Sequence, residues 1–87
     1  MSRFYLHQQT RAGIIKDPDG TEAIDLMAAR HEAILAARQL LANAILAGVT
    51  PLGTAFRITD DAGTLLLIVP FRDALPPRLF EPAKGAW

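Results

Sequence analysis

The sequence predicts an α+β domain in which one long helix packs on a sheet of four mainly antiparallel strands. Residues 26–47 form a run without Pro or Gly that is rich in Ala and Leu, as is typical of a helix. At 1.5 Å per residue this helix is about 33 Å long. The segments on either side of it alternate apolar and polar side chains, which is typical of strands with one buried face. The predicted order is therefore hairpin, helix, hairpin.

The first hairpin lies in the first twenty residues. Residues 3–9 alternate, with Phe4, Leu6 and Gln8 on one side and Tyr5, His7 and Gln9 on the other. Residues 11–16 contain two consecutive Ile residues and form a second strand, which Gly13 weakens or bulges. The Asp-Pro-Asp-Gly sequence at 17–20 predicts a tight turn, because Pro presets φ and Gly accepts a positive φ.

The long helix has one apolar face and a cap at each end. We expect residues 21–25 to lead into it, and Asp25 to accept hydrogen bonds from the amides of the first turn. Gly48 suits a left-handed C-terminal cap, and Pro51 prevents the helix from resuming. At about 100° per residue, the predicted buried face with its margin consists of Leu26, Met27, Ala29, Ala33, Ile34, Ala37, Leu40, Leu41, Ala44 and Ile45.

The second hairpin follows the helix. Residues 54–60 alternate and form a third strand, and the sequence Asp-Asp-Ala-Gly at 60–63 predicts a tight hairpin loop. Residues 64–69 form a fourth strand that is apolar on both faces, which is typical of a central strand or one covered on both sides. We expect one domain over residues 1–74 and an irregular, Pro-rich tail over residues 75–87.

Composition favours assembly. The chain has 87 residues, of which 51% are hydrophobic, whereas a domain of this size buries only about 60 to 65% of the surface of its unfolded chain. Some apolar surface is therefore expected to meet a partner. We expect a homo-oligomer, with a dimer favoured, and allow for another protein partner.

The charge and the distribution of apolar residues argue against several classes of protein. Nine basic and nine acidic side chains give a net charge of zero, and the basic ones are spread along the chain, which makes a nucleic-acid binder unlikely. Residues 1–9 are too polar for an export signal. No stretch reaches the roughly 18 uninterrupted apolar residues of a membrane span, because charged residues interrupt the helix. With no cysteine present, we expect a cytoplasmic protein that does not enter a membrane.

The sequence offers no catalytic constellation. His7 and His31 are the only histidines, and no third ligand stands at a spacing that would complete a metal site. There is no phosphate-binding Gly loop and no assignable Ser, His and Asp arrangement. We therefore predict no catalytic residues, no cofactor, no metal and no enzymatic activity.

Two polar residues have a possible structural or anion-binding role. Arg30 lies within the apolar arc of the helix, so its guanidinium group must reach solvent along its own stem or find a buried acceptor. The candidate partners are Asp17, Asp25, Asp60 or backbone carbonyl groups at a strand end, and pairing is the preferred interpretation. The alternative is a small-anion site that combines Arg30 with His7 and Tyr5.

Two surfaces are candidate seams for assembly. One is a second apolar stripe on the outer side of the helix, which includes Leu35 and Leu46. The other is the sheet face opposite the helix, where Tyr5 would lie with one side of the fourth strand, including Leu66 and Ile68. A dimer could pack sheet on sheet or pair edge strands. The sequence leaves both alternatives open.

Five short motifs together resemble a family of short bacterial proteins known as a domain of unknown function. They are the aromatic start at residues 3–7, the turn at 17–20, the helix start at 25–33, the hairpin at 59–63 and the Pro-Phe-Arg-Asp-Ala segment at 70–74. The resemblance implies a hairpin, helix, hairpin domain, supports a role for Arg30 and His7, and names no reaction. A looser likeness of architecture to small antitoxin domains supplies the competing hypothesis, a regulatory protein that binds a toxin partner or DNA.

Overall fold

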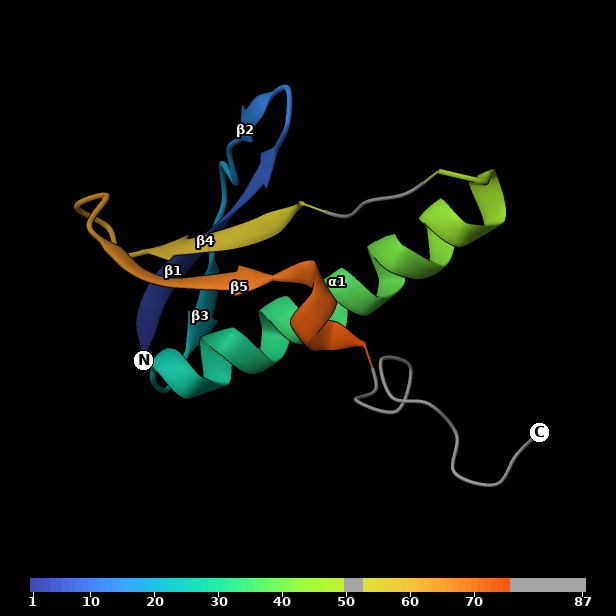
Figure 1. Ribbon diagram of the computed structural model, residues 1–87. Coiled ribbons are helices and arrows are strands. Elements are labelled where there is room, and N and C mark those ends of the chain that lie inside the picture. The colour runs from blue at the N-terminus through green and yellow to red at the C-terminus, as the bar shows by residue number, and fades with distance from the viewer. Residues whose placement is uncertain (50–52, 76–87) are drawn as a thin grey trace.

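The computed structural model describes residues 1–49 and 53–75 and confirms the α+β class. Figure 1 shows one long helix lying across one face of a twisted antiparallel sheet. The predicted tail lies outside the described residues except for Leu75, which packs against the core. The elements are β1 (Ser2–Thr10), β2 (Gly13–Ile15), β3 (Thr21–Ala23), α1 (Leu26–Ala47), β4 (Ala55–Thr59), β5 (Leu65–Pro70) and the 3-10 helix η1 (Phe71–Ala74).

The strand β1 is the centre of the sheet. One of its edges pairs with β4, and the other edge is shared by β3 and β2, which pair with its first and last residues respectively. The strand β3 corrects the prediction that residues 21–25 only lead into the helix. Thr21 pairs with Phe4 and Ala23 with Ser2, and the Ala23 side chain is buried in the core. This pairing connects residues far apart in sequence, so local pattern does not reveal it.

The strand β5 is an edge strand, which contradicts the prediction of a central or doubly covered strand. The order β2-β1-β4-β5 leaves one side of β5 without a neighbour in the described part of the chain. Leu65, Leu66 and Ile68 are exposed, while Val69 is buried. The sequence of a strand that is apolar on both faces does not show whether the strand is central or at an edge. Only the strand order distinguishes these two positions.

The helix α1 begins and ends where the sequence predicts. Its N-cap is Asp25, whose Oδ1 accepts a hydrogen bond from the Ala28 amide at 2.8 Å. Gly48 takes the left-handed conformation, with φ of 75°. Its N–H donates to Ile45 O, and the next N–H, of Val49, donates to Ala44 O at 2.9 Å. These two bonds satisfy carbonyl groups that the end of the helix would otherwise leave free.

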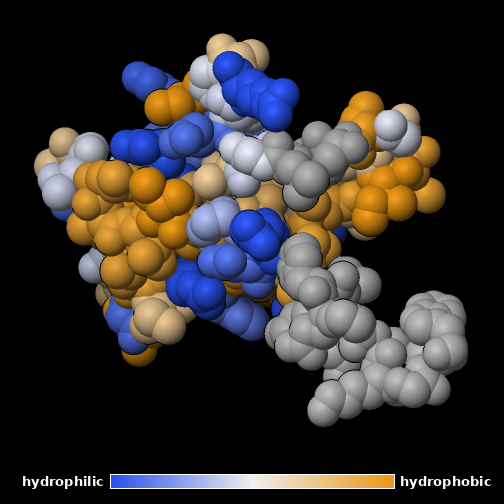
Figure 2. Space-filling model, in the orientation of Figure 1, coloured by the Kyte–Doolittle hydropathy of each residue, from blue (hydrophilic) through white to orange (hydrophobic). Residues whose placement is uncertain are grey.

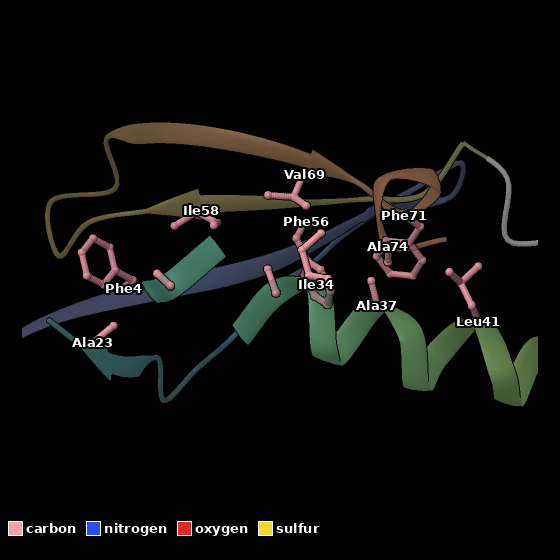
Figure 3. Packing of buried hydrophobic residues seen from close by; sticks show 12 residues of the cluster. Phe4, Ala23, Ile34, Ala37, Leu41, Phe56, Ile58, Val69, Phe71 and Ala74 are labelled. Carbon is pink, nitrogen blue, oxygen red and sulfur yellow. The ribbon is translucent and has the colours of Figure 1, made fainter. Parts of the chain in front are cut away.

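Small residues bring α1 close to the sheet. Ala29, Ala33 and Ala37 are wholly buried. Figure 3 shows Ile34 of the helix beneath the side chains of the sheet, and Ala37 and Leu41 toward the end where η1 lies. The predicted buried face was too wide, because Met27 and Ile45 are exposed. Ile45 lies in the last turns of α1, which extend past the edge of the sheet (Figure 1).

The 3-10 helix η1 completes the core and was not predicted. The Phe71 ring contacts the Phe56 ring, with ring centroids 5.1 Å apart, and Ala74 is buried. Arg38 of α1 donates from Nε to Ala74 O at 3.0 Å. The segment after β5 is therefore held against both the sheet and the helix. None of the helices that the structure describes has the length and apolar character needed to cross a membrane.

Candidate functional site

The sheet face opposite α1 carries a polar and aromatic strip along β1. Because side chains alternate along a strand, Phe4 and Leu6 face the helix while Tyr5 and His7 face away from it, as predicted. The Tyr5 and His7 rings are stacked, with centroids 6.1 Å apart and planes 12° apart. Both side chains are partly buried.

His7 is fixed in one tautomer by its two hydrogen bonds. The Asp17 amide donates to Nδ1 at 3.0 Å. Because an amide can only donate, Nδ1 carries no proton, and Nε2 carries it instead. Nε2 lies 3.2 Å from Thr59 Oγ1 and donates to it. His7 therefore joins β4 to the turn that follows β2, which is a structural role.

Asp17 replaces a missing strand in the middle of β1. Between the part of β1 that pairs with β3 and the part that pairs with β2, residues 5–7 have no strand on that edge. Asp17 Oδ2 accepts from the Leu6 amide at 3.2 Å, and its Oδ1 accepts from the Gly20 amide at 3.1 Å. The carboxylate thus completes backbone hydrogen bonding that two short strands leave open.

Arg57 lies on the same face and was missed in the sequence. It pairs with His7 across β1 and β4, and its Nη1 donates to Gln9 Oε1 at 3.0 Å. The alternation of residues 54–60 shows that Arg57 faces away from Phe56 and Ile58. It does not show that this strand lies beside the first one, so Arg57 and His7 could not be placed together.

Arg30 does not pair with the aspartates proposed for it. Asp25 and Asp60 accept hydrogen bonds from backbone amides, as Asp17 does. Among residues 1–49 and 53–75, no hydrogen bond or ion pair to Arg30 is found, and its side chain is partly buried. It belongs to α1, whereas His7 and Tyr5 face away from α1. The structure therefore does not bring together the three residues of the suggested anion site.

The candidate interface residues separate into two apolar areas. On the outer side and far end of α1, Leu35 is 43% and Leu46 is 87% exposed. On β5, Leu65, Leu66 and Ile68 are 41%, 38% and 45% exposed. Figure 2 shows both areas in orange, one over β5 and the other at the end of α1. Tyr5 lies apart from both, on the central strand, and is only partly exposed.

A shallow hollow at one end of the sheet is lined by three acidic side chains and one basic side chain, together with uncharged residues. Arg3 and Glu22 form an ion pair there, with Nη2 3.0 Å from Oε1, and Asp60 and Asp61 line the same hollow. No group of three or more His, Asp or Glu side chains that could hold a metal ion is found in the described residues.

The fold and its surface define a class of small α+β domain with one covered and one open sheet face. The chain belongs to the family described as domain of unknown function (DUF6894), whose pattern matches residues 3–72. This confirms the resemblance found in the sequence, over nearly the same residues. No curated protein and no solved structure matches the chain.

Proposed function

We propose that this domain is a non-enzymatic, cytoplasmic module that associates with a second copy of itself. The observation that carries the proposal is the uncovered strand β5. It exposes Leu65, Leu66 and Ile68, and no charged residue occurs between residues 64 and 71. Charged side chains are one of the means by which soluble monomers protect an edge strand, and apolar side chains clustered on such an edge are typical of an interface.

The distribution of polar groups favours edge pairing over packing sheet on sheet. The centre of the open face carries His7, Gln9 and Arg57, and the last two are joined by a hydrogen bond. Face-to-face packing would bury these groups against their own copies, at a cost in desolvation. The exposed apolar side chains of β5 lie to one side of these groups, so an interface there leaves the polar strip in water.

The test is the solution mass of the purified full chain, measured by light scattering across a wide dilution series. We expect a dimer that dissociates only at low concentration. A monomer at every concentration contradicts the proposal and favours the competing hypothesis, in which the apolar surface meets a toxin partner or another protein.

Three exposed leucines serve as matched variants. Leu66→Glu places a charge on the proposed interface and should weaken the dimer roughly a hundredfold, through the desolvation of the carboxylate. Leu35→Glu and Leu46→Glu place the same charge on α1 and should leave the dimer unchanged. Circular dichroism checks that each variant is folded. If Leu66→Glu remains as dimeric as the wild type, β5 is not the interface.

A further inference from the structure

We infer that two copies join through the free edges of β5, antiparallel and related by a two-fold axis, so that their sheets become one. This inference rests on the proposed self-association and specifies its geometry. With the axis perpendicular to the sheet, both helices lie on one side of the joined sheet and both open faces lie on the other.

Backbone geometry leaves the N–H and the C=O of one residue of β5 ready for pairing. The Phe71 amide donates to Thr54 O at 3.0 Å, and Ile68 pairs with Arg57 in the same register. Because hydrogen-bonded and non-hydrogen-bonded pairs alternate in antiparallel ladders, the N–H and C=O of Leu67 and Val69 point to β4. Those of Ile68 point to the free edge.

Two features keep this edge short. The register of β4 and β5 shifts between Ile58 and Thr59, and Pro70 has no N–H to offer. Neither feature places a charge on the edge. A short segment centred on Ile68 suits self-pairing, since Ile68 and its copy can exchange two hydrogen bonds across the axis. Leu65 and Leu66 of each copy then lie beside the end of the other strand.

The two ends of β5 carry opposite charge, which sets the direction of pairing. Asp60 and Asp61 precede the strand. Arg72 follows the strand, and Arg38 reaches the same end through its hydrogen bond to Ala74 O at 3.0 Å. Asp73 also lies at this end, so two basic side chains stand there against one acidic side chain. Antiparallel pairing brings each acidic end against a basic end, whereas parallel pairing brings like charges together. This charge complementarity favours a second copy of the chain as the occupant.

The reciprocal charges cannot meet within one chain. The six residues of β5 separate the Asp61 end from the Arg72 end by about 20 Å at 3.3 Å per residue. At physiological salt, exposed charges farther apart than about 8 Å are largely screened. A coupling between Asp61 and Arg72 in solution therefore reports a contact between two copies.

The first experiment exchanges these charges in the full chain. Asp61→Arg and Arg72→Asp each turn two attractive contacts of the dimer into repulsive ones, and each should raise its dissociation constant roughly tenfold. The double variant restores attraction with the signs reversed, so its dissociation constant should return close to the wild-type value. In about 1 M salt, where the Debye length is roughly 3 Å, the differences should nearly disappear.

The second experiment removes the free N–H. Ile68→Pro deletes a donor that β4 does not use and should give a folded monomer, because Pro is tolerated on the open side of an edge strand. Ile68→Ala keeps the donor and should keep the dimer. Should Ile68→Pro fail to fold, the charge exchange still decides the matter.

The outcomes separate the two proposals. A wild-type dimer that survives both single charge exchanges without loss of affinity overturns the edge pairing but leaves self-association standing. A wild-type monomer overturns both. A double variant that is no tighter than either single variant also contradicts the antiparallel contact.

Discussion

At the scale of single residues, His7 and Asp17 connect segments that no continuous strand joins. Asp17 uses both its backbone and its side chain, because its amide donates to His7 Nδ1 and its carboxylate accepts from the Leu6 amide. His7 uses its two ring nitrogens. A histidine on an open sheet face could suggest catalysis, but both nitrogens of this one are occupied. The same residue that the family resemblance marks as important is therefore explained by hydrogen bonding within the fold.

His7→Phe tests this role. Phenylalanine can keep the stacking with Tyr5 but leaves the Asp17 amide and the Thr59 hydroxyl without their partner. We expect the free energy of unfolding to fall by about 1 to 3 kcal/mol, the cost of unsatisfied, partly buried polar groups. Urea denaturation measures the change.

Tyr5→Phe is the matched control, since no hydrogen bond to the Tyr5 hydroxyl is found in the part of the chain that the structure describes. It should change stability by less than about 0.5 kcal/mol. Equal stability of His7→Phe and Tyr5→Phe would show that the His7 hydrogen bonds contribute nothing measurable.

At the scale of elements, the sequence predicts features that depend on neighbouring residues and misses features that depend on residues far apart in the chain. The helix bounds were predicted correctly because Asp25 and Gly48 act on the residues next to them. The strand β3 was missed because its partner is β1, and because Glu22 also suits a segment that leads into the positive end of a helix dipole. The exposure of β5 and the position of Arg57 depend on strand order, which local pattern does not contain.

Two glycines with similar backbones differ in their surroundings. Gly20 and Gly48 have φ of 71° and 75°, so Ala at either position meets the same left-handed strain, about 1 to 2 kcal/mol. At Gly20 a Cβ would also lie 2.9 Å from Phe4 O, whereas at Gly48 nothing lies within 4 Å. The turn at 17–20 therefore packs directly on β1.

Gly20→Ala should accordingly be more destabilising than Gly48→Ala, by at least about 1 kcal/mol, because the backbone of β1 must move to make room. Thermal denaturation of both variants, followed by circular dichroism, measures the difference. If the two variants have the same melting temperature, the close approach of Gly20 to β1 is not a constraint on the fold.

At the scale of the whole molecule, the proposed self-association would account for both the apolar content of a small chain and the open edge of its sheet. A domain of this size has little interior, and the apolar composition by itself predicts an assembly. It could not choose between the helix stripe, the open face and the strand edge. The proposal places the interface at the β5 edge, because the open face is polar at its centre while Leu66 and Ile68 expose apolar surface on β5.

The most direct test of the proposed pairing between two β5 strands is hydrogen exchange at the Ile68 amide, followed by NMR at several protein concentrations. The amides of Leu67 and Val69 donate to β4 and should be protected throughout. The Ile68 amide should be protected in concentrated samples and lose its protection on dilution, because its partner is a second copy. Rapid exchange at every concentration, or protection that dilution does not change, would contradict pairing between copies.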